Sequence, residues 1–496
     1  MSSVKLCDGI GDRLAAQHLG FFEGANQGFS GWMTPPPSLW SDKGPMSAQS
    51  ISRRTFLKRT AGAGAAFALA PTSKAVNKLI PYVNPPTETR PGVWSLFATT
   101  CRECPAGCGL HIRHIDGRAI KAEGNPAHPI NHGTLCARGQ SSVQGLYDPD
   151  RLTQVLFRAH GQPPSPASWS DAFSAIANRL RGTKGRVALL SDLQTGALAE
   201  LMQQFVRAFD SQRLVFYEPF NYEALAAAHQ ALFDLPDIPD YRLVERCDFI
   251  LSLSADFLET WLSPVQFARA FSDSHAYAEG KKGYLTYVGP RLSATAANAD
   301  EFLQVPPGTE RWLALGMLKI IVDRGWGKQD SDRLAPLIGA IDLGAVTVAT
   351  GVSAARIEHL AQAFVEAKGS VALAGPTGAS GHAATETAMA AAWLNHVAGR
   401  DGQSVDFART HAISQTATHA SLERFFADIT DEDTLIIHAA NPVFTMPGTA
   451  GAIHRAGMVV YLGTMMDETA ELATWCLPVD SPLEAWGDYE PQGKRI

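Results

Sequence analysis

The residues best suited to chemistry in this 496-residue chain are four cysteines spaced as C-x2-C-x3-C-x27-C: Cys101, Cys104, Cys108 and Cys136. The first three thiolates lie close enough in sequence to surround one face of a 4Fe-4S cluster, and the fourth, from a later loop, completes its ligands. Glycines beside these cysteines let the backbone turn tightly and bring amide groups close to the sulfides. The spacing therefore predicts one iron–sulfur cluster.

Zinc and free thiols are the alternatives for these cysteines. A structural zinc site usually combines two knuckles of the C-x2-4-C or H-x3-5-H type, whereas Cys136 stands alone. The remaining cysteines, Cys7, Cys247 and Cys476, lie far apart in the sequence, so they indicate no disulfide framework. We interpret them as buried or incidental thiols.

A second motif lies upstream of the cysteines. Residues 52–58 read Ser-Arg-Arg-Thr-Phe-Leu-Lys, and a small apolar run follows at residues 61–70. This layout is typical of a twin-arginine export signal, with a run too short to span a bilayer, and an internal basic helix is the alternative. The twin-arginine route exports proteins already folded with their cofactors, which fits a cysteine array directly downstream. We therefore expect a periplasmic protein, or one on the outer face of the cytoplasmic membrane.

The rest of the N-terminal region offers no regular pattern. We predict an irregular extension at residues 1–45, the signal at 46–75 and an extended, proline-rich arm at 76–94, with Met46 as a candidate start site. No segment has the length of uninterrupted apolar sequence that a transmembrane helix requires. Any membrane attachment is therefore expected to come through partner subunits.

Overall charge and composition exclude one class of function. The formal net charge of −7 and the isoelectric point near 6.1 argue against nucleic-acid binding, which requires a basic face. With 45% hydrophobic residues, the chain can bury a large core and should fold into several domains.

The elements that must position the cysteines can be predicted from periodicity. Residues 110–123 alternate apolar and polar around Asp116-Gly117, which predicts a hairpin beneath the cluster. Further along, helical patterns such as 196–209 and 309–322 alternate with short apolar strands. The predicted strands are 186–191, 214–217, 249–253, 284–288, 371–374, 434–438 and 458–462. This alternation is typical of parallel α/β domains, whose ligands lie at the carboxyl ends of the strands.

Several blocks of sequence carry a family resemblance. They read Cys-Arg-Glu-Cys-Pro-Ala-Gly-Cys-Gly-Leu at 101–110, Asp-Gly-Arg at 116–118, Glu-Gly-Asn-Pro-Ala-His-Pro at 123–129 and Leu-Cys-Ala-Arg-Gly-Gln at 135–140, with later blocks at 289–300, 307–310, 441–442, 468–470 and 477–478. This ordered set resembles the molybdopterin bis-guanine-dinucleotide oxidoreductases, which include formate dehydrogenases, nitrate reductases and polysulfide reductases. Motifs at 80–86 and 147–151 resemble most the molybdopterin-like half of the iron–sulfur subunit of alternative complex III, a quinol:cytochrome c oxidoreductase.

The resemblance implies an α/β fold. A small N-terminal 4Fe-4S domain at 95–150 would be followed by two Rossmann-like parallel-sheet domains, one inserted in the other. The first α/β domain would comprise 151–213 and 369–496, and the inserted α/β domain would comprise 214–368. The family continues beyond this point into a last domain, so we expect a C-terminal domain to be missing from this chain or encoded separately.

The resemblance also implies roles for individual residues. Arg138 would lie between the cluster and a pterin, where a cation holds anionic groups in register. Further dinucleotide contacts would come from Ala255, Asp256, Arg291, Thr295, Gly308, Thr309 and His382. Gly289 and Glu310 stand where the family usually has aspartate, which weakens two of these contacts.

The molybdenum ligand of the family has no obvious counterpart here. That ligand is a cysteine, selenocysteine, serine or aspartate about a dozen residues before a Phe-Gly-like step, which in this chain is Phe233-Asp234. Counting back reaches the tripeptide 220–222, Phe-Asn-Tyr, in which no residue is a usual ligand. The nearby carboxylates, Glu218 and Glu223, are interpreted first as solvated charges.

These observations lead to three functional hypotheses. We expect an exported subunit of a respiratory oxidoreductase that passes electrons through one 4Fe-4S cluster and binds a molybdopterin guanine dinucleotide without molybdenum. Its partners would be a ferredoxin-like iron–sulfur subunit and a quinone-reactive membrane subunit. The alternatives are a competent molybdenum or tungsten bis-pterin oxidoreductase and a degenerate structural scaffold. No catalytic acid or base can be assigned.

Overall fold

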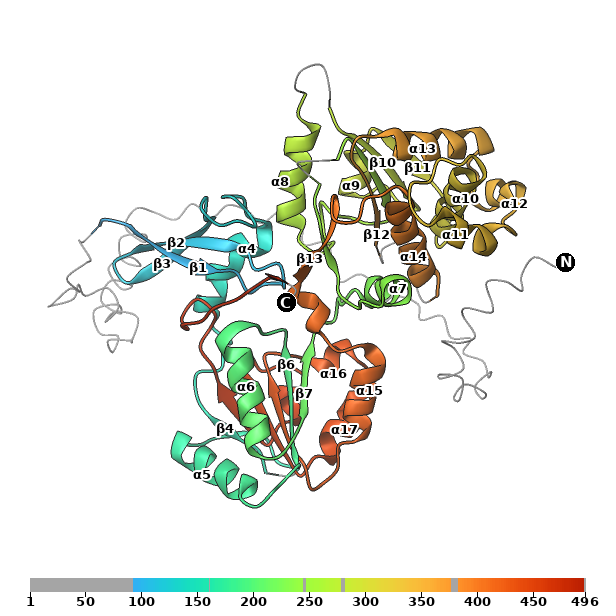
Figure 1. Ribbon diagram of the computed structural model, residues 1–496. Helices are drawn as coiled ribbons and strands as arrows, with labels where there is room; N and C mark the ends of the chain where they lie inside the picture. The colour runs from blue at the N-terminus through green and yellow to red at the C-terminus, as the bar shows by residue number, and fades with distance from the viewer. Residues whose placement is uncertain (1–91, 160, 244–246, 278–281, 376–381, 495–496) are drawn as a thin grey trace, which may run out of the picture. The chain divides into compact units, whose positions relative to one another are not determined.

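The computed structural model describes residues 92–159, 161–243, 247–277, 282–375 and 382–494 (Figure 1). Residues 95–496 belong to one compact unit. The predicted extension, the export signal and nearly all of the arm fall within residues 1–91, outside the described residues.

A small antiparallel sheet supports the cysteines. Its order is β1 (Ser95–Thr100), β2 (Gly109–Ile115) and β3 (Arg118–Gly124). Strands β2 and β3 form the predicted hairpin, and its turn places Asp116 and Gly117 at φ angles of 47° and 82°. Helix α4 (Ala137–Ser141) and the 3₁₀ helix η1 (Ser142–Tyr147) follow the last cysteine.

The first α/β domain is built on a seven-stranded sheet in the order β5-β4-β16-β15-β14-β6-β7. Its strands are β4 (Leu156–Phe157), β5 (Ser165–Pro166), β6 (Val187–Asp192), β7 (Arg213–Tyr217), β14 (Thr434–His438), β15 (Met458–Gly463) and β16 (Trp475–Pro478). Its helices are α5 (Trp169–Leu180), α6 (Gly196–Ala208), α15 (His419–Ala427), α16 (Pro442–Thr445), α17 (Thr449–Arg455) and the 3₁₀ helix η3 (Ala470–Leu472). The strands from β16 to β7 are parallel, with α6 on one side of the sheet and α15 and α17 on the other (Figure 1).

The inserted α/β domain has a four-stranded, fully parallel sheet in the order β11-β10-β9-β12. The strands are β9 (Phe249–Leu253), β10 (Tyr284–Gly289), β11 (Glu301–Gln304) and β12 (Ser370–Ala374). The helices are α7 (Glu223–Phe233), α8 (Pro264–His275), α9 (Ala294–Ala297), α10 (Glu310–Asp323), α11 (Ser331–Ile338), α12 (Leu343–Thr350), α13 (Ala354–Glu366) and α14 (His382–Val397). Strands β9 and β12 are buried along their whole length, as expected for parallel strands covered by helices on both faces.

A third sheet contains the last described residues. It is antiparallel, in the order β17 (Gln492–Lys494), β13 (Val405–His411) and β8 (Pro239–Tyr241), and the 3₁₀ helix η2 (Ala412–Gln415) follows β13. Strand β17 is thereby held beside residues more than eighty positions earlier in the chain, such as Arg409, which pairs with Lys494.

The structure confirms each of the seven predicted strands, with ends that differ by at most one residue. The predicted domain boundaries at 213/214 and 368/369 stay predictions, but strand pairing follows a slightly different division. Strand β7 pairs with β6 in the first domain, and β12 pairs with β9 in the inserted domain. Each of these two strands therefore belongs to the sheet with which it forms backbone hydrogen bonds.

Each parallel sheet contains one position where the strand order reverses, which is where open α/β sheets bind ligands. In the first domain, β6 leads outward to β7 whereas β14 leads the other way to β15 and β16, so the first switch point lies between β6 and β14. In the inserted domain, β9 leads to β10 and β11 whereas β12 lies on the opposite side, so the second switch point lies between β9 and β12.

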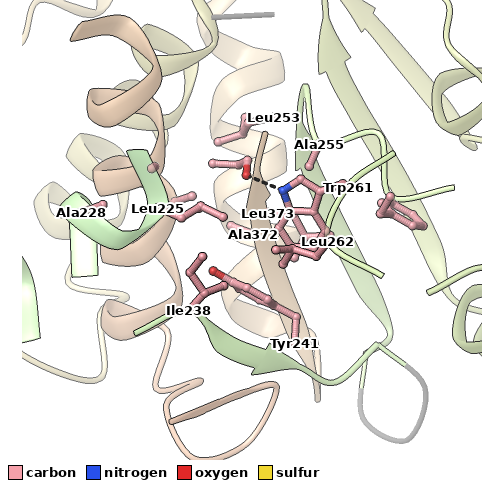
Figure 2. Close-up of a cluster of buried hydrophobic side chains, with 14 of the residues drawn as sticks. Leu225, Ala228, Ile238, Tyr241, Leu253, Ala255, Trp261, Leu262, Ala372 and Leu373 are labelled. Atoms are coloured by element: carbon pink, nitrogen blue, oxygen red, sulfur yellow. Dashed lines mark hydrogen bonds between the residues drawn. The ribbon is translucent and has the colours of Figure 1, made fainter. Parts of the chain in front are cut away.

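The core near the second switch point is apolar and closely packed. Figure 2 shows Trp261 beside Leu253, Leu373 and Tyr241, with its indole N–H donating to the carbonyl oxygen of Ala374 at 3.0 Å. This hydrogen bond ties the loop after β9 to the end of β12. Burying an aromatic side chain of this size with its polar atom satisfied stabilises the fold by about 2–3 kcal/mol.

The described residues include no single helix long and apolar enough to cross a membrane. Among these residues, α11 and α12 reach such a length and apolar composition only together, and the two helices meet at an angle of 73°.

Candidate iron–sulfur site and switch points

The cysteine thiols gather in one largely buried cluster. Cys101 and Cys108 are buried, Cys104 and Cys136 are partly buried, and all four pack with apolar side chains such as Leu110. The backbone N–H of Cys101 donates to the carbonyl oxygen of Cys108 at 2.7 Å, which closes the first loop into a compact turn. The structure therefore brings together the four thiols that the sequence spacing predicted.

Burial determines the protonation of these thiols. Burial, with a smaller contribution from the neighbouring cysteines, raises the pKa of Cys101 and of Cys108 to about 12. The pKa of Cys104 is also raised, again mainly by burial. Without a positive centre these groups hold their protons at neutral pH, so only a bound metal or cluster would make them thiolates.

Asn131 joins the two loops that carry the cysteines. Its fully buried side chain accepts a hydrogen bond from the N–H of Gly109 at 2.8 Å and donates to the carbonyl oxygens of Gly109 and Thr134. Asn131 thus fixes the residue after Cys108 relative to the residues before Cys136. The sequence prediction missed it; the only signal was a polar residue in a glycine- and proline-rich loop that must be buried under the cluster.

Arg138 lies near two carboxylates and one of the thiols. Its charge lowers the pKa of Cys104, Glu103 and Glu218, in each case against a larger effect of burial that raises the pKa. Arg138 lies on helix α4, two residues after the last cysteine, and its charge acts on Cys104 and on Glu218, the residue after strand β7. This position suits a cation between a cluster and an anionic group.

Residues 220–222, which stand where the family has its molybdenum ligand, include no soft ligand. Phe220 is 81% exposed, Asn221 donates to the carbonyl oxygen of Ala417 at 3.3 Å, and the Tyr222 hydroxyl donates to the carbonyl oxygen of Thr260. Glu218 differs from the predicted solvated charge, because burial raises its pKa and a cavity of about 550 Å³ opens beside it. Among the described residues, no three histidine, cysteine, aspartate or glutamate side chains are grouped as ligands of a single metal ion.

At the second switch point, the predicted dinucleotide contacts form a network around Asp256. The fully buried Asp256 carboxylate accepts hydrogen bonds from the Tyr287 hydroxyl and from Arg291, both at 2.8 Å. The Thr295 hydroxyl accepts from the N–H of Leu258 at 3.1 Å. The structure therefore brings Asp256, Arg291 and Thr295 together, although each already has a partner within the chain.

The other predicted contacts surround this network. The N–H of the buried Ala255 donates to Ser252, Gly308 adopts a φ of 79°, and Thr309 lies at the start of helix α10, where its hydroxyl donates to the carbonyl oxygen of Pro306. His382 begins helix α14.

Glu310 stands out at the second switch point. Its side chain is fully buried, one carboxylate oxygen accepts from the Ser254 hydroxyl at 2.7 Å, and the other has no hydrogen-bond partner among the described residues. Burial raises the pKa of Glu310. A buried acceptor without a donor is costly unless a ligand supplies one, so this position suits a ligand bearing N–H groups, such as a guanine base.

At the first switch point the polar groups pair with one another. The Ser191 hydroxyl contacts His438 at 2.9 Å, and Asp192 forms an ion pair with Arg102 at 3.6 Å. The carboxylate of Asp488 lies at the N-terminus of helix α6, where it accepts a hydrogen bond from the N–H of Ala197 at 2.9 Å.

Tyr489, the residue after Asp488, links the first switch point to the cysteines. Tyr489 packs its ring against the guanidinium of Arg102, 3.8 Å from the ring centroid, and its hydroxyl donates to the carbonyl oxygen of Pro105. A side chain added at Gly107 would overlap the Tyr489 ring at 2.6 Å. Residues 488–494, which we call the C-terminal strap, therefore contact the cysteine loop, helix α6 and strand β13.

The cysteine-bearing domain is followed by two α/β sheets, one formed by a segment inserted in the other. Residues 94–148 match the molybdopterin oxidoreductase Fe4S4 domain. This match supports a 4Fe-4S cluster, and the chain is similar to molybdopterin oxidoreductases. The predicted resemblance and the fold class are thereby confirmed. The assignment of the four cysteines as the ligands stays a prediction.

The similar proteins are respiratory subunits and enzymes of this group. The chain is 29% identical over 421 residues to the menaquinone reductase, molybdopterin-binding-like subunit, of Nitratidesulfovibrio vulgaris, covering 80% of this chain and 60% of that protein. It is 28% identical to the molybdopterin-containing subunit of arsenate respiratory reductase from a Shewanella species, covering 56% of this chain and 34% of that protein. The chain thus spans between about a third and three fifths of the length of these relatives.

A solved structure supports the fold. Acetylene hydratase from Pelobacter acetylenicus superposes with a TM-score of 0.64 at 15% identity, covering 79% of this chain and 64% of that one.

Proposed function

We propose that the chain is an exported subunit of a respiratory oxidoreductase complex and passes electrons through one 4Fe-4S cluster. The observation that carries this proposal is the gathering of four thiols in one buried cluster beside Arg138. When bound, such a cluster supplies one-electron transfer.

The comparisons and the sequence support different parts of the proposal. The Fe4S4 domain match supports the cluster, and the relative, which is a subunit of menaquinone reductase, supports a subunit working within a complex. Partners of that kind are a ferredoxin-like iron–sulfur subunit and a quinone-reactive membrane subunit. Export is proposed from the twin-arginine motif at residues 52–58.

The residues of the chain would prepare the site for this task. Leu110 and Ile112 surround the thiols with apolar groups and limit access of water, which sets the polarity around the sulfur atoms. Asn131 fixes the two ligand loops relative to each other. Arg138 balances negative charge near the thiolates, and no side chain is required to act as acid or base.

Low-temperature EPR of the protein purified without oxygen tests this proposal. Reduction with dithionite should give one reduced-cluster signal per chain, and reductive titration should take up one electron. A chain that takes up no electron under these conditions would contradict the proposal. Export is tested separately by replacing Arg53 and Arg54 with lysine, which should retain the protein in the cytoplasm while its cluster signal persists.

One observation favours a competent molybdenum or tungsten enzyme as the second candidate. Glu218 is held beside a cavity of about 550 Å³, and its charge also affects the Cys104 thiol, so a carboxylate lies close to the place where a metal ligand would be needed. In that case the purified chain should contain molybdenum or tungsten, and Glu218→Gln should remove it. Equal, negligible amounts of both metals in the two proteins would exclude this candidate.

A further inference from the structure

The two switch points differ in what occupies them. At the first, the N-terminus of helix α6 points its free N–H groups at the Asp488 carboxylate, 2.9 Å from the nitrogen of Ala197. Helix α6 is thirteen residues long and has no side-chain cap from its own N-terminal residue, Thr195. The positive end of the helix dipole is thus neutralised by a residue 291 positions later in the chain.

The surrounding contacts keep Asp488 in this place. The next residue but one, Glu490, donates its N–H to the hydroxyl of Thr195 at 2.7 Å. Tyr489 between them is fixed to Pro105 and Arg102. Gly196 adopts a φ of 65°, and a side chain there would overlap the Asp488 carboxylate, so the backbone approaches the strap closely. The C-terminal strap is therefore attached on both sides of Asp488.

A phosphate group needs the same place that Asp488 fills. Helix N-termini bind phosphates through free N–H groups and the helix dipole, and both are already used by a carboxylate here. A phosphate brought to this helix would also lie against the negative charge of Asp488 and of the nearby Asp192. Electrostatic repulsion and steric overlap both oppose it.

The second switch point is different, because it keeps an unused acceptor. One oxygen of the buried Glu310 carboxylate has no partner among the described residues, and the nearby Gly308 adopts a φ of 79°. Taking the proposed function as given, we propose that Asp488 closes the first switch point, so that this chain holds one dinucleotide diphosphate, in the inserted domain, instead of two.

Pyrophosphate binding tests the role of Asp488 without reference to activity or to the pterin. Sites per chain are counted by equilibrium dialysis for the wild type, for Asp488→Ala and for Asp171→Ala, each checked for unchanged iron content and circular dichroism. Asp171 is a matched control, since it lies in the first turn of helix α5, away from the switch point. Asp488→Ala should gain one site over the wild type, whereas Asp171→Ala should gain none. An unchanged count in a folded Asp488→Ala protein overturns the proposal.

Nucleotide content is the second test and needs no variant. Guanosine monophosphate released by acid hydrolysis is counted against iron in the purified wild type. One nucleotide per cluster supports the proposal, and two overturn it. With none, the inserted domain holds no dinucleotide either and the count of one is overturned, while the pyrophosphate count still decides whether Asp488 closes the first switch point.

Discussion

The two α/β domains differ in strand order but each has one switch point, and the two switch points present different chemistry. In the first domain, Asp192, His438 and the start of helix α6 are all paired within the chain. In the inserted domain, Glu310 keeps a buried oxygen without a partner among the described residues. The comparison shows that strand order alone defines where a ligand could bind to a parallel sheet. The side chains at the carboxyl ends of the strands determine whether groups remain there to bind it.

The difference arises from a segment distant in sequence. The C-terminal strap reaches the first switch point from residues 488–494 and is anchored to the cysteine loop by Tyr489. Glu310 is also fully buried, but it is contacted from within the inserted domain, where the Ser254 hydroxyl donates to it. The first switch point is consequently coupled to the cluster, and the second is not, which leads to five predictions.

Loss of a cluster ligand should have the largest effect and should affect only one switch point. Cys104→Ser or Cys136→Ser should abolish the visible absorption of the cluster and remove nearly all bound iron, because serine is a poor ligand for iron. Hydrogen exchange should then increase in the C-terminal strap and at the start of helix α6, but not around Glu310. Iron analysis and exchange mass spectrometry measure the two effects.

Matched thiol variants serve as the control for this prediction. Cys247 and Cys476 are buried and donate to the carbonyl oxygens of Arg242 and Ala470, a role that a serine hydroxyl can take over. Cys247→Ser and Cys476→Ser should keep the full iron content. Full iron content in Cys104→Ser as well would show that the assigned thiols hold no cluster.

Changing Glu310 should have the next largest effect and should act on the open switch point. Glu310→Gln removes a charged acceptor, and hydrogen bonds to a charged group contribute about 1.5–3 kcal/mol, so the affinity for guanosine monophosphate should fall roughly ten- to a hundredfold. Calorimetric titration of the nucleotide measures the change. An unchanged affinity would place the nucleotide away from Glu310 and remove the contrast between the two switch points.

The same substitution should change how stability depends on pH. Because burial raises the pKa of Glu310, its carboxyl holds a proton in the folded chain at pH values where the unfolded chain has lost it. The wild type should therefore lose stability relative to Glu310→Gln as the pH rises above the ordinary glutamate pKa of about 4.3, up to the raised pKa. Melting temperatures of both proteins between pH 4 and 8 should diverge in this direction; parallel curves would contradict it.

Removing the ring that anchors the strap should have a smaller effect. Tyr489→Ala removes the contact with Arg102 and uncovers Gly107, so the cluster should lose its absorption in air several-fold faster. Tyr489→Phe keeps the ring but loses the hydrogen bond to Pro105, which contributes about 1 kcal/mol. Its rate of absorption loss should therefore lie between those of the wild type and Tyr489→Ala. Tyr277, 78% exposed, provides the control, since Tyr277→Ala should leave the rate unchanged.

The smallest effect is expected at the surface of the first domain. Lys184 and Asp210 form an ion pair at 3.1 Å with side chains 83% and 63% exposed. Such pairs contribute little to stability in water, so Lys184→Ala should change the free energy of unfolding by less than about 0.5 kcal/mol. The nucleotide and iron content of this variant should equal those of the wild type. A loss of nucleotide or iron in this variant would show that the measured effects above are not specific.

Local patterns were sufficient to predict most of the fold. Short apolar strands between helical segments gave the β-strand positions, and the spacing of the cysteines gave the four thiols that the structure gathers. Asn131 could not be found in this way, because its role depends on hydrogen bonds between two loops. Asp488 was missed for the same reason, since its partner Ala197 lies 291 positions away.

Charges at the candidate site were the least predictable feature. The sequence favours a solvated charge at Glu218, yet packing at the end of β7 partly buries this residue and raises its pKa. Glu310 likewise has no sequence signal for an unpaired oxygen. Burial depends on which elements meet in space, and that information is absent from local sequence patterns.

The most direct test of the account is elemental analysis of the chain purified without oxygen, with iron, zinc, molybdenum and tungsten measured per chain. An electron-transfer subunit with one cluster predicts about four irons and only traces of the other three metals. Stoichiometric molybdenum or tungsten, or zinc in place of iron, would contradict it.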